Sequence, residues 1–170
     1  MAVFGAPFRK GDDAERAVAA LLLLLACAAV RLDAQRIAPR PEFRADVLGA
    51  APYTVQFGGG VNLGAGYYQR VELDAAAGAL RRDGVLRGTG RADALMRLLL
   101  DPFGQQHWAL SLAGGVSLRY EAGDKVRPYL TGVLDFEGPV NHGVRVAYQL
   151  GFGGGVRFGI VLRRTHTVWR

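Results

Sequence analysis

The stretch 107–120, HWALSLAGGVSLRY, indicates how the rest of this chain folds. Its even-numbered positions are apolar or glycine and run from Trp108 to Tyr120, whereas its odd-numbered positions include Ser111 and Arg119. Because successive side chains of a strand point to opposite faces, this alternation predicts a β-strand. At about 3.3 Å per residue, the two end aromatics lie roughly 40 Å apart along the strand. If the strand is tilted by about 40–45°, the height of this apolar row is close to that of the apolar band of a transmembrane barrel. Aromatic residues at both ends of the row match the aromatic girdles that flank such a band.

The same alternation recurs along the chain as far as residue 164. No position in the apolar rows is charged, although 21% of all residues are charged. An arginine or lysine that faces lipid at mid-depth costs roughly 2–4 kcal/mol, and lipid does not tolerate open sheet edges. The sequence therefore predicts an all-β fold, a closed up-and-down antiparallel transmembrane β-barrel. The alternating segments are 43–51, 55–67, 71–79, 92–100, 108–120, 126–136, 144–152 and 156–162.

We expect eight strands from these segments. The count falls to six if the glycines 153–155 form a kink within one long strand and segment 43–51 lies outside the barrel. Polar or glycine-rich connections are predicted between the strands, the most polar of them at residues 81–90, where Asp83-Gly84 is a typical turn dipeptide. The other predicted connections are 64–68, 101–106, 121–125 and 137–143.

Length and composition set broad limits. A chain of 170 residues fits one domain, and 24 glycines suit tight turns and closely approaching strands. The net charge of +6 permits anionic partners, such as anionic lipid, lipopolysaccharide phosphate or nucleic acid, and it also fits a solvated arginine-rich surface. The single cysteine, Cys27, excludes a disulfide within the chain and a cysteine-based zinc site. We expect no cofactor and no metal.

The N-terminal residues have the pattern of an export signal. Basic residues precede an apolar run at 17–30, which is short for a membrane-spanning helix, and cleavage after Ala34 is plausible. A lipoprotein signal acylated at Cys27 and a buried N-terminal helix of a soluble protein are the alternatives. The predicted organisation is a helical signal peptide at 1–34, a linker at 35–42, the β-barrel at 43–164 and a C-terminal tail at 165–170.

The polar rows predict what fills the barrel. An eight-stranded barrel is just wide enough for its own side chains to fill the interior, and buried charges need partners. We therefore expect ion pairs inside the lumen, and the arginine excess leaves a small anion-selective passage as the alternative. The predicted lumen charge network is Arg44, Asp46, Arg70, Glu72, Asp74, Arg91, Asp93, Arg97, Arg119, Arg127, Asp135, Arg145 and Arg157. The predicted aromatic girdle is Tyr67, Trp108, Tyr120 and Phe136.

Catalytic residues are difficult to assemble from this sequence. His107, Ser111 and Glu121 share the inward parity of one strand, but residues four apart on a strand are about 13 Å apart, which is too far for a histidine to activate a serine. His142 lies in a predicted turn and His166 in the tail. No nucleophile-elbow or phosphate-binding motif is present. We expect that the protein is not an enzyme.

Several segments carry a family resemblance: the leader ending DAQ (33–35), the strands VQFGGGVNL (55–63) and YQLGFGGGVRFGIVL (148–162), and the central WALSLAGGVSLRY. Over roughly residues 42–164 the chain resembles the small bacterial outer-membrane β-barrel proteins of the OmpA/OmpX-like and porin-like type. The resemblance implies export through a signal peptide and insertion into the outer membrane. It also implies outer-membrane lipid, lipopolysaccharide and the barrel-assembly machinery as partners, with no role for nucleic acid.

We therefore expect a structural or unassigned role in the bacterial envelope. One alternative is a soluble or lipid-anchored, lipocalin-like periplasmic barrel that binds an apolar ligand inside, with the two faces inverted. The direction in which Leu110, Leu112 and Leu118 point distinguishes the two. A second alternative is a lipid A acyl hydrolase or transferase with its site at the barrel rim. The sequence leaves the ligand, the conductance and the oligomeric state open.

Overall fold

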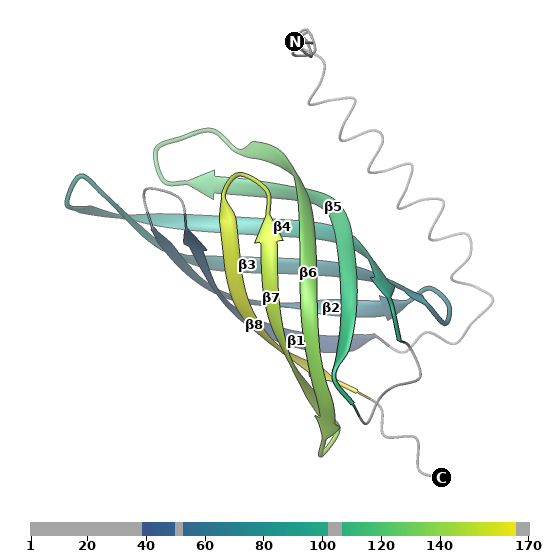
Figure 1. Cartoon of the computed structure of the whole chain (residues 1–170). Helices are drawn as coiled ribbons and strands as arrows, with labels where there is room; N and C mark the ends of the chain where they lie inside the picture. The colour runs from purple at the N-terminus through teal and green to yellow at the C-terminus, as the bar shows by residue number, and fades with distance from the viewer. Residues whose placement is uncertain (1–38, 50–52, 102–106, 166–170) are drawn as a thin grey trace, which may run out of the picture. The chain divides into compact units, whose positions relative to one another are not determined.

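A computed structural model describes residues 39–49, 53–101 and 107–165, which lie within one compact unit of the chain, residues 37–170. These residues form eight strands of one sheet. Consecutive strands pair antiparallel, and β1 pairs with β8, so the sheet closes (Figure 1). The strands are β1 (Arg40–Gly49), β2 (Thr54–Gly64), β3 (Gln69–Arg82), β4 (Val85–Leu99), β5 (Ala109–Glu121), β6 (Arg127–Asn141), β7 (Val144–Phe152) and β8 (Val156–Arg164).

The closed up-and-down barrel of eight strands is thereby confirmed. Segment 43–51 contributes to β1, which lies between β2 and β8, and the glycines 153–155 form a turn with positive φ angles between β7 and β8. The count of six strands is therefore wrong. The predicted signal peptide, with Cys27, and most of the C-terminal tail lie outside the described residues. Among the residues that the structure describes, no helix is long and apolar enough to cross a membrane.

Burial alternates along the strands in the predicted register. In β5, Leu112 is 53% exposed, whereas its neighbour Ser111 is fully buried and Ala113 is nearly so. Cross-strand pairing keeps the rows aligned around the barrel, because Leu112 lies opposite Leu98 on β4 and Leu134 on β6, and both are exposed. The apolar rows therefore cover the outside of the barrel, and the polar rows line its interior.

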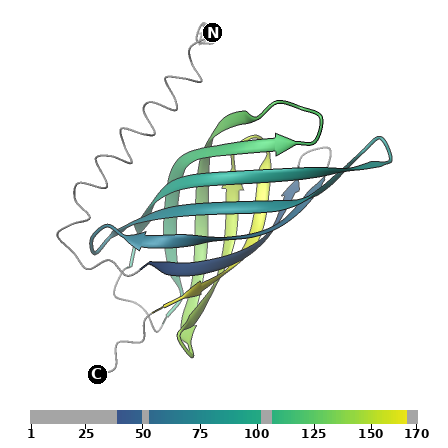
Figure 2. The same cartoon turned by 180° about the vertical axis from the view of Figure 1, so that it is seen from behind.

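Several predicted boundaries are wrong, all at the ends of strands. β1 begins at Arg40, inside the predicted linker 35–42. Only Asp83 and Gly84 separate β3 from β4, so most of the predicted connection 81–90 is strand. The hairpin of β3 and β4 projects past its neighbours as a result (Figures 1 and 2). Strand ends beyond the apolar band face water, so their polar composition does not reveal that the ladder continues.

The predicted connection 137–143 is also too long. β6 continues to Asn141, and its pairing with β7 shifts by one residue between Glu137 and Val140. Glu137 keeps the inward parity of Asp135, and the bulge breaks the simple two-residue rhythm beyond it. A bulge of this kind leaves no clear signal in the local composition.

An inward-facing glycine allows two neighbouring strands to approach closely. A Cβ atom added at Gly115 on β5 would lie 2.9 Å from the Cα atom of Leu95, its partner on β4, which is closer than real Cβ atoms come. At the adjacent Gly114, which faces outward, the nearest atom is the carbonyl oxygen of Thr131 at 4.0 Å. Gly115 therefore marks a site where the two strands approach closely, as glycines do at the corners of barrels.

Candidate functional site

The inward rows bring a dense set of charges together inside the barrel. Arginines and carboxylates are present there in nearly equal number, which suits a buried environment where each charge needs a partner. The buried charged residues are Arg44, Arg91, Arg97, Arg145, Arg157 and Arg163, together with Glu42, Asp46, Glu72, Asp74, Asp93, Asp135 and Glu137.

One group of these residues lies toward the end of the barrel where β1 begins and β8 ends. Arg97 donates to Glu72, to Asp135 and to the hydroxyl of Ser111, the last at 3.1 Å. Arg163 lies 3.0 Å from both Glu42 and Glu137, and 2.5 Å from Asp135. We call this group the terminus-end network. Its members are Glu42, Glu72, Arg97, Ser111, Asp135, Glu137, Arg145 and Arg163.

Arg44 on β1 connects this group to the opposite end of the lumen. Its guanidinium lies 3.5 Å from Glu72, ion-pairs with Asp74 on β3 and donates 3.2 Å to Asp46. It also donates to the side-chain oxygen of Gln149 on β7. One side chain thus links three strands across the interior, which stabilises the closed form of the sheet.

A second group lies toward the end formed by the β7–β8 turn. Arg91 Nη2 donates 2.6 Å to Asp46 Oδ2, and Arg91 Nε lies 3.0 Å from Asp93 Oδ2. Arg157 Nη1 reaches the same Asp93 oxygen from β8 at 2.7 Å. We call Asp46, Arg91, Asp93 and Arg157 the turn-end network. Its two arginines share one carboxylate oxygen.

An apolar layer separates the two networks on one wall of the lumen. On β4, Leu95 lies between Asp93 and Arg97, and it packs against Ala113 and Val133 in one buried cluster. Ala147 on β7 and Val161 on β8, which are cross-strand partners, are also fully buried inside the barrel. The lumen therefore contains an apolar layer as well as the predicted charges.

The structure places the predicted lumen residues as follows. Arg70 and Arg119 are half-buried, and Arg127 is exposed, with 61% of its side chain accessible and an ion pair of 2.6 Å to Asp124. The prediction for Arg127 is wrong. β6 begins at this residue, so the side chain has the parity of the inward row but lies at the rim of the barrel, where it is exposed. The buried members of the predicted set are Arg44, Asp46, Glu72, Asp74, Arg91, Asp93, Arg97, Asp135, Arg145 and Arg157.

Three buried ionic residues were not in the predicted network. Glu42 was assigned to the linker and Glu137 to a connection, so both were excluded by the boundary errors described above. Arg163 has the inward parity of β8, and extending that parity to the end of the strand would have found it. Glu42 and Glu137 could have been predicted only if the true start of β1 and the true end of β6 had been known.

The four predicted girdle aromatics are all exposed. The ring of Trp108 stacks on Phe136 with centroids 4.6 Å apart and lies 6.3 Å from the ring of Tyr148. Tyr67, in the β2–β3 turn, lies toward the same end of the barrel, and Tyr120 lies at the far end of β5. Aromatic rings therefore occur toward both ends of the outer surface, as in the girdles of membrane barrels.

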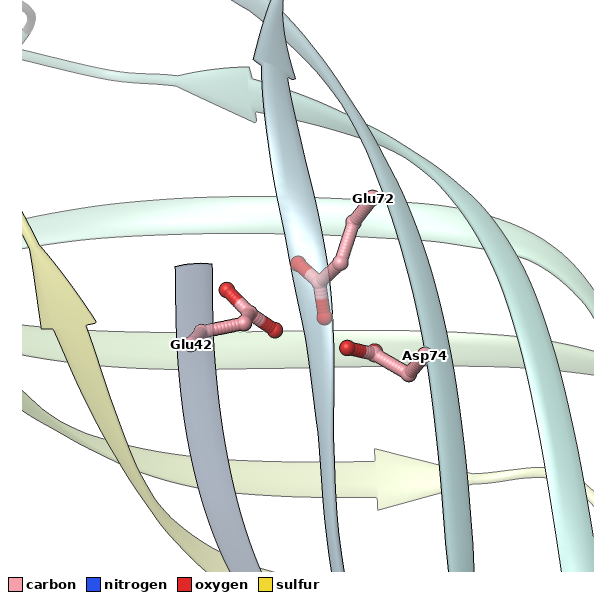
Figure 3. Close-up of side chains that lie close together, drawn as sticks. All are labelled: Glu42, Glu72 and Asp74. Carbon is pink, nitrogen blue, oxygen red and sulfur yellow. The ribbon is translucent and has the colours of Figure 1, made fainter. Parts of the chain in front are cut away.

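Three carboxylates, Glu42, Glu72 and Asp74, lie close enough to share a cation, with one oxygen of each within 4.8 Å of the others. Figure 3 shows them pointing toward one another from two regions of the barrel wall. Each already has an arginine partner: Arg163 at Glu42, Arg97 at Glu72 and Arg44 at Asp74. Because guanidinium groups balance these charges, we assign the cluster to the ion-pair network.

The catalytic candidates are not assembled into a site. The hydroxyl of Ser111 is buried, accepts from Arg97 and lies 3.1 Å from Glu137, to which it donates. His107 is exposed just before β5, His142 lies in the β6–β7 turn with a positive φ angle, and His166 lies outside the described residues. Ser111 is therefore held within the terminus-end network, and the geometry gives it no role as a nucleophile.

A closed eight-stranded antiparallel barrel with an apolar exterior and a charged, filled interior has the architecture of a transmembrane β-barrel. No family model matches the chain, and no curated protein matches it either. Among solved structures, it is similar to the solution NMR structure of the de novo designed TMB2.3, with a TM-score of 0.50 and 14% identity. The match covers 77% of this chain and 96% of that one. At this identity the likeness is one of fold alone.

Proposed function

We propose that this protein is a small barrel of the bacterial outer membrane, with a structural role in the envelope and a lumen closed to solutes. The observation that carries the proposal is the segregation of its faces, with apolar rows outside and an ion-pair network inside. The signal-like segment at 1–34 supports export, which an outer-membrane location requires. The family resemblance of residues 42–164 supports the choice of the outer membrane.

The outer surface has the charge distribution that lipid requires. Among the described residues, the exposed charged side chains within strands lie near strand ends. Between them the barrel presents Leu, Val, Phe, Ala and Gly, so no charge would have to enter the hydrocarbon region. These end residues are Arg81, Arg87, Arg127 and Arg164.

The interior supports a closed lumen. Arg97, Glu72 and Asp135 have no surface accessible to water, although they come from β4, β3 and β6. Their mutual ion pairs cross the barrel interior. A passage for anions would need some of these groups to be accessible along the axis, so the filled lumen favours a structural role over a pore.

The lipocalin-like alternative is contradicted by the direction of the apolar rows. Leu110, Leu112 and Leu118 are exposed on the outside of β5. The interior that would have to receive an apolar ligand holds the ion-pair network instead. The alternative of a rim-located lipid A enzyme has no structural support from Ser111, and comparison of lipid A species by mass spectrometry with and without the gene tests it directly.

The proposal is tested by fractionating cells that express the chain and running the outer-membrane fraction on a gel with and without boiling. We expect the protein in that fraction, with faster migration before boiling because the closed barrel resists detergent. A soluble periplasmic product would overturn the proposal. In planar bilayers the purified barrel should show no stable conductance, and steady ion conductance would refute the closed lumen while leaving the membrane location intact.

A further inference from the structure

We propose that the turn end of the lumen is a binding site for a small oxyanion of the phosphate class, held by Arg91, Arg119 and Arg157. The proposal goes beyond the structural role above. It rests on how these three guanidinium groups are arranged and on which of their N–H groups lack a partner.

The three arginines converge from different strands. Arg91 on β4 and Arg119 on β5 are direct cross-strand partners, a pairing of like charges that is unfavourable by itself. Arg157 comes from β8, and its Nη1 and the Nε of Arg91 both approach Asp93 Oδ2, at 2.7 and 3.0 Å. The side chains thus lie around one end of the lumen, with a single carboxylate shared between two of them.

Several of their donors are unused. Among the described residues, Arg91 Nη1, Arg119 Nε, and both Nε and Nη2 of Arg157 have no hydrogen-bond partner. Arg91 and Arg157 are only 4% and 3% exposed, so these donors are also screened from bulk water. A buried donor without an acceptor is costly, and an oxyanion supplies several acceptors in a geometry that suits guanidinium groups.

Few carboxylates are available to these three arginines. Arg91 contacts Asp46 and Asp93, and Arg157 contacts Asp93. Asp46 also binds Arg44, and the half-buried Glu121 of the same end pairs with Arg82. The three arginines of the proposed site therefore outnumber the carboxylates that they contact.

Arg119 connects the site to the rim. It is half-buried, donates 2.8 Å to the carbonyl oxygen of Gly154 in the β7–β8 turn, and lies 5.4 Å from the ring centre of Tyr129. These contacts position the guanidinium of Arg119 between the buried Arg91 and Arg157 on one side and the solvent on the other. A phosphate group could be captured there either as a free ion or as the headgroup of a lipid.

The test measures arginine Nε–Hε signals by NMR in the full chain refolded into micelles of an uncharged detergent. Inorganic phosphate is added, with potassium chloride at matched ionic strength as the reference. A second arm uses bilayers of phosphatidylcholine with and without phosphatidylglycerol. The variant is Arg119→Gln, and its matched control is Arg127→Gln, because Arg127 is the β6 partner of Arg119 and is exposed at the same rim.

We expect phosphate to shift the signals of Arg91, Arg119 and Arg157 beyond the effect of chloride. R119Q should weaken this binding about tenfold, the loss of one charge-assisted hydrogen bond, and R127Q should leave it unchanged. Shifts that occur only in bilayers with phosphatidylglycerol would assign the site to a lipid headgroup. Absence of specific shifts in both arms, or equal effects of the two variants, would overturn the proposal.

Discussion

At the terminus end of the lumen, Arg97 uses all three of its guanidinium nitrogens and donates to Glu72, Asp135 and Ser111. At the turn end, Arg157 shares one oxygen of Asp93 with Arg91 and leaves its Nε and Nη2 without a hydrogen-bond partner. The same residue type, on two strands of one barrel, therefore has two different environments. A saturated guanidinium suits the closure of the barrel, whereas unused donors suit binding. The number of partners that an arginine has, more than its charge, distinguishes a structural position from a candidate site.

The largest expected effect comes from removing the saturated guanidinium of Arg97. Arg97→Met removes a fully buried arginine that donates to Glu72, Asp135 and Ser111. Glu72 then keeps only contacts of 3.5 and 3.6 Å, to Arg44 and Arg163, so we expect the free energy of unfolding to fall by about 3–5 kcal/mol. Arg157→Met should lower it by only about 1–2 kcal/mol, because Asp93 keeps Arg91. Urea unfolding in bilayers of fixed composition measures both, and equal losses would contradict the distinction between the two ends.

The next effect concerns the apolar layer between the networks. Leu95→Ala would leave a cavity next to Ala113 and Val133, and we expect a loss of about 2–4 kcal/mol in the same unfolding assay. If the free energy of unfolding fell by less than about 1 kcal/mol, the surrounding side chains would have moved in to fill the cavity. The layer would then contribute little to the separation of the two ends.

A smaller effect tests the close approach of β4 and β5 beside this layer. Gly115→Ala places a Cβ atom against the backbone of β4, and we expect it to cost about 1–3 kcal/mol. Gly114→Ala is the matched control, because its Cβ atom would point outward with its nearest neighbour, the carbonyl oxygen of Thr131, 4.0 Å away. The stability of this variant should stay close to that of the parent. If both variants unfold at the same urea concentration, the close approach of β4 and β5 does not need a glycine.

The smallest effect lies at the rim beyond the turn end. The backbone N–H of Lys125 and the guanidinium of Arg127 hold the pKa of Asp124 below its ordinary value. Because the folded-state pKa is the lower one, the stabilisation is present above the unfolded pKa and is lost as pH falls through the folded pKa. Arg127→Gln should raise this pKa in an NMR titration without a measurable change in unfolding. An unchanged pKa would show that Arg127 contributes nothing to it.

Much of the fold could be predicted from the sequence. The two-residue alternation of stretches such as 108–120 identifies the outward row, because a single charge there would face lipid. The same parity finds most of the buried charges, including Arg44 and Asp135. Parity is a local property of each strand, so it needs no knowledge of the barrel as a whole.

The ends of the strands could not be predicted in this way. Arg127 has inward parity but lies at the rim, and Glu42 and Glu137 were hidden in segments that composition marks as connections. The sequence also could not predict which arginine pairs with which carboxylate. The pairing depends on contacts across the lumen, such as that of Arg157 with Asp93, between residues far apart in the sequence. Only closure of the sheet brings them together.

The central claim is that the apolar rows face lipid and the polar rows face the lumen. Leucine provides an internal control, because Leu112 and Leu130 lie on the outer face, whereas Leu80 and Leu95 are buried within the barrel. The measurement is paramagnetic broadening of leucine methyl NMR signals by a nitroxide attached to the lipid acyl chain. We predict strong broadening at Leu112 and Leu130 and little at Leu80 and Leu95. Uniform broadening, or broadening of the second pair alone, would contradict the account.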